Sequence, residues 1–266
     1  MSGYLKYFKT ELIMGLQYKV AAISGLCTQF FWGILYCLLY EAFYSHASID
    51  AISFKEMICY VWLMQSFLSL IYLRVNDTEI LENIKSGTVA YELCRPYSIY
   101  YWWYIRILSK KYAAVALRCL PVIIFAFLLP EPYRLALPLS LEAFVLFIIS
   151  LILGSFVVVG LSMIIHSISF FTLESKGITS IVCSIGEILS GFAIPIPLLP
   201  NFLINITKYM PFRLIGDTPF RIYSGNINVI EAKELIILQI VWIILLVIIG
   251  NLLIKKALKK VCIQGG

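Results

Sequence analysis

The chain has 266 residues, of which 61% are hydrophobic and 14% are charged, and its formal net charge is +6. A soluble domain has roughly 45 to 50% apolar and about 25% charged residues, so this composition excludes a soluble globular protein and predicts an all-α, polytopic membrane protein. The positive charge does not call for nucleic acid as a partner, because basic residues beside membrane spans face anionic lipid.

The first segment, residues 1–19, is predicted to be a helix at the membrane interface. Apolar residues recur at Leu5, Phe8, Leu12 and Leu16, which is the spacing of one helix face. The segment has no small-residue cleavage site, so we do not expect a signal peptide. It either anchors the span that follows or packs beside the polar hairpin later in the chain, and the pattern leaves both roles open.

Six segments are long and apolar enough to cross the membrane. Crossing about 30 Å of hydrocarbon takes roughly 20 helical residues, and the continuous apolar runs indicate helices rather than short alternating strands. Small residues at helical spacing, Ser150 and Gly154, favour close helix packing around the fourth span. We predict one transmembrane domain over residues 1–266, with spans at about 20–44, 56–74, 110–129, 139–165, 177–199 and 235–254.

A polar hairpin, residues 76–103, separates the second and third predicted spans. Asn76 can cap a helix, with Glu79 three residues later, and Ser86-Gly87 supplies a stop where a left-handed residue costs little. The pattern predicts a short helix over about 77–85. The aromatic run that follows favours the membrane interface, so we expect it to hold the hairpin flat against the inner surface.

Two ionisable residues lie deep within predicted spans, Arg118 in the third and Glu187 in the fifth. Charge in hydrocarbon is costly, so such residues are candidates for function. They either pair with each other or line a cavity. A structural pair and a substrate contact both remain open.

Residues 198–222 are apolar but interrupted by Pro200, Pro211 and Pro219, and they are too short for two more crossings. Two short helices that dip into the membrane from outside and return fit this pattern best, provided that protein surrounds their backbone. We expect this re-entrant segment to cover the outer end of a transport path.

The distribution of Lys and Arg predicts that both termini and the polar hairpin lie in the cytoplasm. With the N-terminus inside, the inner segments hold fourteen of the 21 basic residues, the outer segments hold six, and Arg118 lies within a span.

The sequence shows no pattern for a metal site, for catalysis or for nucleotide binding. Its seven cysteines form no CxxC pair and its two histidines are far apart, so we expect no metal or redox site. A phosphate-cradling G-x-x-x-x-G-K-[ST] loop does not occur. We therefore do not expect an enzyme or a bound cofactor, and any ATP that drives the protein must bind another chain.

Residues 84–96 read IKSGTVAYELCRP and resemble the I-x-x-G-x-x-x-x-x-L-x-R-P signature of ABC-2 type ABC transporter permeases. The likeness is closest to small six-span permeases encoded beside a second permease and an ATPase. It covers essentially the whole chain. Three further stretches are similar to the outer segment of that family: Pro195-Ile196-Pro197, Met210-Pro211-Phe212-Arg213 and Thr218-Pro219-Phe220-Arg221.

The resemblance implies an exporter subunit in a bacterial cell membrane, whose hairpin carries a coupling helix that docks on a cytoplasmic ATPase. It implies two ATPase copies, which hold ATP and Mg, and a second permease, identical or homologous. The docking face that it assigns consists of Asn76, Asp77, Glu79, Glu82, Asn83 and Lys85, with Gly87, Arg95 and Pro96 as the residues that aim it.

Two functions from other classes also remain open. A transporter driven by an ion gradient would use Arg118 and Glu187 as a relay, but it would be expected to show internal repeats, and none is found. A non-transporting membrane scaffold has no sequence feature in its favour. The aromatic-rich spans suit a hydrophobic or amphipathic cargo, such as a drug, peptide or lipid, without selecting among these classes.

Overall fold

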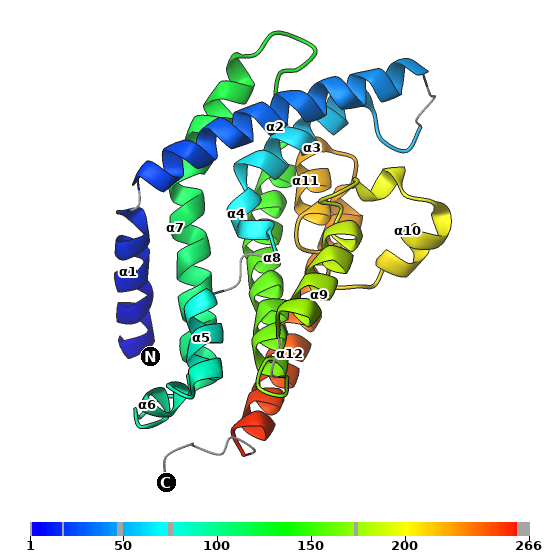
Figure 1. Ribbon diagram of the computed structural model, residues 1–266. Helices are drawn as coiled ribbons and strands as arrows, with labels where there is room; N and C mark the ends of the chain where they lie inside the picture. The colour runs from blue at the N-terminus through cyan, green and yellow to red at the C-terminus, as the bar shows by residue number, and fades with distance from the viewer. Residues whose placement is uncertain (1, 18, 47–49, 74–76, 173–174, 260–266) are drawn as a thin grey trace.

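The computed structural model describes residues 2–17, 19–46, 50–73, 77–172 and 175–259, and these residues form helices and no strands. The prediction of an all-α protein is thus confirmed. In chain order (Figure 1) the elements are α1 (Ser2–Leu16), α2 (Lys19–His46), α3 (Phe54–Ser66), α4 (Leu68–Ile71), α5 (Thr78–Ser86), α6 (Val89–Leu93), α7 (Ile99–Leu128), α8 (Leu141–Ile168), α9 (Ser175–Leu189), the 3-10 helix η1 (Ile196–Leu198), α10 (Asn201–Thr207), α11 (Asp217–Ser224) and α12 (Val229–Leu258).

Four of the described helices, α2, α7, α8 and α12, are long and apolar enough to cross a membrane. Their 28 to 30 residues extend about 42–45 Å, which exceeds the roughly 30 Å of hydrocarbon. The predicted spans 20–44 and 235–254 fall within α2 and α12, and the predicted span 139–165 overlaps α8 from Leu141 onward. The predicted span 110–129 covers only the second part of α7, because buried aromatic residues continue that helix back to Ile99.

The predicted spans 56–74 and 177–199 correspond to shorter helices. α3 has 13 residues and is interrupted at Phe67 before α4, while α9 has 15 residues and ends at Leu189. Helices of these lengths reach only about 20–22 Å. The expectation of a continuous helix over 177–199 is wrong, because the chain turns at Gly191, which has φ +77°. Tyr60 of α3 fixes this turn, since its hydroxyl donates to the Gly191 carbonyl at 3.0 Å.

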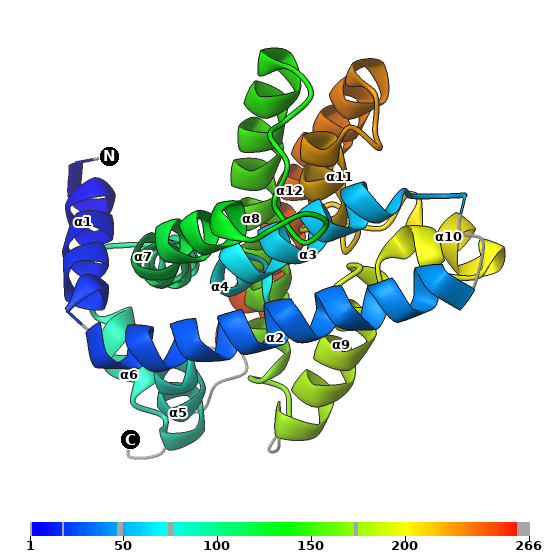
Figure 2. The same ribbon diagram turned by 90° about the horizontal axis from the view of Figure 1, so that it is seen from above.

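α8 is the most buried of the four long helices and lies inside the bundle, against α12, α11 and α7 (Figures 1 and 2). A helix that is apolar on all sides is expected in such a position. Glycines allow the close approach: a Cβ on Gly160 would lie 2.9 Å from Leu246 Cβ, and one on Gly154 would lie 2.7 Å from the Ile215 carbonyl oxygen. The close contact predicted at Gly154 is present, but its neighbour is the turn at Leu214 and Ile215 before α11 rather than another helix.

α1 runs lengthwise along α7 (Figure 1). The placement of residues 1–19 at the membrane interface stays a prediction. Of the predicted apolar face, Leu5 is 67% exposed, whereas Phe8 packs against Tyr112 of α7 and Leu12 and Leu16 are half-buried. Contact is also made by Tyr7, which stacks on Trp102, and by Gly15, where a Cβ would lie 2.5 Å from Ala113 Cβ.

The start of α1, the helices α5 and α6, and the end of α12 all lie at one end of the bundle, whereas the connection from α7 to α8 lies at the other (Figure 1). The prediction that both termini and the hairpin lie on the same side of the membrane requires this arrangement.

Residues 198–222 form short helices, with prolines at their starts. Pro195 and Pro200 occupy the N-cap positions of η1 and α10, and Pro219 lies in the first turn of α11, where a missing N–H costs little. A buried ion cluster that the sequence analysis did not identify secures the segment. Asp217 Oδ2 accepts from Arg213 Nε at 3.4 Å and from Arg221 Nη1 at 3.3 Å.

The glycine contacts of α8 lead to a stability prediction. Gly154→Ala should destabilise the protein by about 1–3 kcal/mol, because the added Cβ meets a backbone carbonyl that cannot rotate away. Thermal unfolding of the purified chain in detergent, followed by tryptophan fluorescence, measures the effect. Gly177→Ala on α9 is the matched control: no atom lies within 4 Å of its added Cβ, so it should be neutral or slightly stabilising. Equal melting temperatures for the two variants would contradict the packing argument.

Candidate functional site

Helix α5 begins at Thr78, capped by Asp77. The Asp77 Oδ1 atom accepts a hydrogen bond from the Glu79 backbone N–H at 3.2 Å. The cap predicted at Asn76 lies outside the described residues. The predicted end is confirmed: Gly87 has φ +76° in the left-handed region, and its N–H donates to the Ile84 carbonyl at 3.4 Å.

The Asp77 carboxylate also joins α5 to α7. Its Oδ2 atom lies 2.8 Å from Arg106 Nε and 2.6 Å from Lys110 Nζ, and its side chain is only 4% exposed. Arg106 pairs in addition with Glu79. A buried carboxylate is stable only when cations and hydrogen bonds replace its lost hydration. The cap of α5 therefore depends on two basic residues one turn apart on α7.

These partners set the ionisation of Asp77. Burial by itself would raise the pKa of this carboxyl, but the hydrogen bond from Lys110 and the charges of Arg106 and Lys110 outweigh burial, so the pKa lies below its ordinary value of 3.8. Asp77 is consequently charged at neutral pH.

Glu92 of α6 makes a second link between the hairpin and α7. Its Oε2 atom accepts from Trp103 Nε1 at 2.6 Å, and its Oε1 atom accepts from Asn83 Nδ2 at 3.3 Å. Asn83 Oδ1 accepts in turn from Thr88 Oγ1 at 3.0 Å. One carboxylate thus connects α5, α6 and α7. The sequence analysis missed Glu92, which occupies an unspecified position of the 84–96 motif.

Most of the aromatic run at the end of the hairpin packs against other helices, although the Tyr101 side chain is 43% exposed. The placement of this run at the membrane interface stays a prediction. Tyr100 and Trp103 are buried. The Trp102 ring is stacked between Tyr7 of α1, with centroids 3.6 Å apart, and Tyr97, with centroids 4.2 Å apart. The rings therefore attach α1 and the hairpin to the start of α7.

The residues predicted to form the docking face separate into two groups. Glu82 and Lys85 are exposed, whereas Asp77 bonds to α7 and Asn83 bonds to Glu92 and Thr88 within the hairpin. A docking role for Asp77 does not fit its burial. Glu79 is 61% exposed but already paired with Arg106. The outward surface, which we call the hairpin face, consists of Glu82, Lys85, Tyr91, Leu93, Arg95 and Pro96.

A buried lysine supports the region behind the hairpin. Lys111 is 3% exposed, and its Nζ donates to the carbonyls of Tyr72 at 2.7 Å and Ser69 at 3.4 Å. These carbonyls belong to the C-terminal end of α4, where helical carbonyls lack partners and a cation is favoured. This role of Lys111 was not predicted from the sequence.

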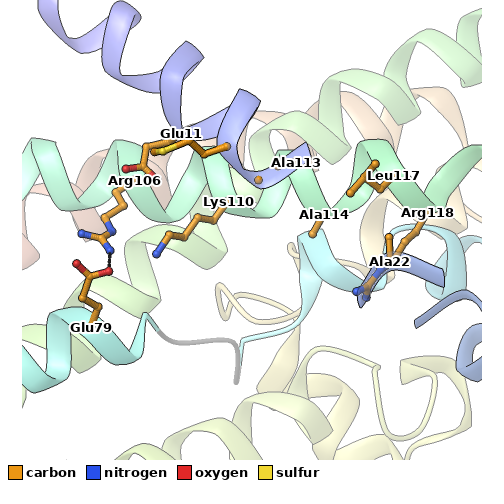
Figure 3. A pocket seen from close by; sticks show the side chains of 11 residues that line it. Glu11, Ala22, Glu79, Arg106, Lys110, Ala113, Ala114, Leu117 and Arg118 are labelled. Carbon is orange, nitrogen blue, oxygen red and sulfur yellow. Dashed lines mark hydrogen bonds and ion pairs between the residues drawn. The ribbon is translucent and has the colours of Figure 1, made fainter. Parts of the chain in front are cut away.

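Arg118 and Glu187 lie in different surroundings. Arg118 lines two cavities, of about 570 and 380 Å³, beside α7 (Figure 3). Glu187 is half-buried near the end of α9, and among the described residues it lines neither cavity. Lining a cavity, one of the two alternatives left open by the sequence, thus describes Arg118 and not Glu187 at the two cavities beside α7.

A family model described as ABC-2 family transporter protein matches residues 30–265. The chain belongs to the ABC-2 transporter family. This confirms the resemblance carried by residues 84–96. An ABC-2 permease is a multi-pass membrane subunit of a transporter, generally non-catalytic, that associates with an ABC ATPase. Comparison with curated proteins gives no significant match.

For this permease, Asp77→Asn should loosen the hairpin without unfolding the bundle. Asn still caps α5, but the ion pairs with Arg106 and Lys110 are lost. We expect local opening of residues 78–93 to become easier by about 2–3 kcal/mol, less than for a fully buried pair, because Lys110 is 42% exposed. Hydrogen exchange of these amides measures the free energy of this local opening. Glu82→Gln, on the hairpin face, is the control that should leave exchange unchanged; equal effects would refute the buried pairing.

The lowered pKa of Asp77 also predicts the pH dependence of the hairpin. A carboxylate with a depressed folded-state pKa contributes stability that is present above its ordinary value of 3.8 and is lost as the pH falls through the lower folded value. Amide protection of residues 78–93, corrected for intrinsic exchange rates, should therefore stay constant from about pH 7 to 5 and decline below 3.8. Asp77→Asn should remove this decline.

Proposed function

We propose that this chain is the permease subunit of an ATP-driven exporter in a bacterial cell membrane, with both termini in the cytoplasm. A separate cytoplasmic ATPase, in two copies, binds ATP and Mg. The observation that supports this best is the construction of the α5–α6 hairpin, which is bonded firmly to α7 and presents an exposed, mixed charged and aromatic face at the end of the bundle where α1 starts and α12 ends.

The bonds around Asp77 and Glu92 give the proposed coupling a physical route. When two ATPases close on ATP, the hairpin face moves with them. Because Asp77 and Glu92 hold the hairpin to α7, and α7 packs on α8, the displacement passes to helices within the membrane. Coupling requires a structural element with two arrangements, whose balance depends both on the ATPase and on the transport path. The candidate element is the hairpin together with α7.

Six spans complete the proposed topology. α3 with α4, and α9 with the turn at Gly191 and η1, make the two crossings that are shorter than the bilayer, with the outer segment of residues 198–222 re-entering beside them. Protein surrounds much of this irregular backbone, since the Leu214, Ile215 and Phe220 side chains are buried. That is the condition for non-helical chain at membrane depth.

A second permease, identical or homologous, is part of the proposal. α2 and α12 present large exposed apolar side chains along their lengths, such as Phe31, Leu38, Ile237 and Leu252. These surfaces suit lipid and a partner permease alike.

The proposed cargo is hydrophobic or amphipathic. A cavity of about 710 Å³ between α2 and the segment around η1 is lined by Tyr36, Tyr40 and Phe43 on one side and by Ile194 and Pro197 on the other. Aromatic and apolar walls of this size suit a drug-like, peptide or lipid-like molecule. The alternative of an ion-gradient relay is weaker, because Arg118 lines the two cavities beside α7 and Glu187 does not. A non-transporting scaffold gains no support from the hairpin.

Charge exchange on the hairpin face tests the coupling proposal. The double variant Glu82→Lys with Lys85→Glu keeps the net charge but inverts the pattern, and we expect ATPase association to weaken about five- to tenfold through mismatched charges. The permease is coexpressed with its cognate ABC ATPase, and copurification and substrate-stimulated ATP hydrolysis in nanodiscs are measured.

Glu234→Lys, at the exposed start of α12, is the control for a charge change at the opposite end of the bundle. Glu79→Lys is unsuitable as a test, because it also breaks the pair with Arg106. Unchanged assembly and transport in the double variant would remove the hairpin face from the mechanism.

A further inference from the structure

An apolar cavity of about 630 Å³ lies at the end of the bundle where α7 ends and α8 begins, opposite the hairpin (Figure 1). Three helices each contribute a pair of side chains to it: Leu63 and Phe67 of α3, Ile123 and Phe127 of α7, and Phe144 and Ile148 of α8. The members of each pair are four residues apart, which is the spacing of one helix face. Residues of the connection between α7 and α8, together with Tyr223 of α11, complete the wall.

The cavity has a buried floor and an exposed mouth. Leu63 and Phe147, at the floor, are buried, whereas Leu137 and Leu141, which also line the cavity, are exposed. The helix rises about 10 Å between Leu141 and Ile148. The cavity therefore extends along about two turns of α8, which is less than the half of a roughly 30 Å hydrocarbon core that one lipid leaflet occupies.

The lining of the cavity is almost entirely apolar. Among the described residues that form it none is charged, and the polar ones are Ser140 and Tyr223. The Tyr223 hydroxyl donates to the Ala136 carbonyl at 3.1 Å, and Ser140 Oγ accepts from the Ala143 N–H at 3.1 Å as the cap of α8. A polar ligand would lose its hydration here without gaining equivalent hydrogen bonds. The cavity therefore suits a hydrocarbon.

Exposed leucines adjoin the mouth of the cavity. Their side chains are 77–79% exposed: Leu128, Leu137, Leu139 and Leu141. An exposed apolar patch of this kind marks contact with a membrane or with another protein. Directly beside it, the exposed Glu142 pairs with Lys233 of α12 at 3.0 Å. Charged residues are depleted from the core of a protein interface, but they are usual at a membrane boundary, where they reach water beside apolar neighbours. The mouth therefore faces lipid.

We propose that this cavity holds one acyl chain of a phospholipid from the leaflet on this side of the membrane. An empty cavity loses the dispersion contacts of its walls, and water inside it would lack the polar partners that it needs. An acyl chain that enters from the mouth supplies the dispersion contacts without leaving an apolar medium. Its headgroup stays at the level of the Glu142–Lys233 pair.

The bound chain contacts elements that meet at this end of the bundle. Phe67, at which α3 ends, and Tyr223 of α11 both line the cavity. The Phe147 ring lies edge-on to both, with ring centroids 5.9 Å from Phe67 and 5.1 Å from Tyr223. An acyl chain here joins the break between α3 and α4 to α11. The inference goes beyond the exporter proposal, because it concerns a lipid that stays with the protein rather than a cargo.

The test uses the full-length chain in phosphatidylcholine nanodiscs that contain a small fraction of phosphatidylcholine with a photoactivatable diazirine in the middle of one acyl chain. After illumination, mass spectrometry of peptides locates the adducts. We expect adducts on Leu63 and Phe147, which surrounding lipid does not reach because they are 1% and 2% exposed, as well as on the exposed Ile240 and Ile244 of α12. A probe with the diazirine on its headgroup should label neither Leu63 nor Phe147.

Filling the cavity provides a second arm. Ile148→Trp adds volume without altering charge and should lower the adducts on Leu63 and Phe147 about fivefold or more, because overpacking opposes entry of the chain. Ile149→Trp is the matched control: Ile149 is 41% exposed, against 36% for Ile148, and is not among the described residues that line the cavity. Its adducts should equal those of the unmodified chain.

A pair of variants at the mouth avoids any change in the core. Leu137 and Leu139 are equally exposed, but of the two only Leu137 belongs to the described lining. Leu137→Gln should therefore reduce labelling of the floor, and Leu139→Gln should not. A monodisperse elution profile shows that each variant folds.

Absence of adducts from Leu63 and Phe147 while Ile240 is labelled would overturn the inference, whether a second copy of the chain covers the mouth or a cargo fills the cavity. Equal losses in Ile148→Trp and Ile149→Trp would also overturn it. The measurement needs neither the ATPase nor transport. A failure of the exporter proposal would therefore leave this result unaffected, and a failure here would leave the coupling proposal intact.

Discussion

The ionic contact of Asp77 with Arg106 and Lys110 is the constraint on which the arrangement of this protein depends. It caps α5, fixes the hairpin against α7 and holds a carboxylate that is 4% exposed in its charged form. Without it, the hairpin would be joined to the bundle by the Glu92 bonds and by packing of residues such as Ile80. A transmitted force needs a stiff connection, and a buried, doubly paired carboxylate supplies one because breaking it leaves an uncompensated charge.

The irregular parts of the fold are secured in a common way, by polar side chains of other helices that donate to backbone carbonyls. Lys111 of α7 binds the end of α4, Tyr60 of α3 binds the turn at Gly191, and Gln239 of α12 binds the carbonyl oxygens of Ser150 and Leu214 at 2.9 and 2.8 Å. An unpaired carbonyl in an apolar interior costs several kcal/mol. Helix breaks are thus tolerated where a donor on another helix replaces the missing helical bond.

The basic residues of α7 lie in two different settings. At the hairpin end, Arg106 and Lys110 hold the carboxylate of Asp77. About three turns beyond Arg106, Arg118 lies against the backbone of α2 at Gly25 and borders a cavity. α1 forms part of the wall of this cavity and also stacks on Trp102 beside the hairpin.

Periodicity, composition and capping chemistry determined the helical class, the apolar segments, the stop at Gly87 and the family, because each depends on residues close together in the chain. The sequence could not decide which face of the hairpin points outward, since Glu79, Glu82 and Asp77 are chemically alike until Arg106 and Lys110 approach from α7. Nor could it show that Trp102 stacks on Tyr7 or that α9 ends at the Gly191 turn held by Tyr60. Those outcomes depend on contacts between distant residues, where burial and pairing compete, and only the tertiary structure resolves that competition.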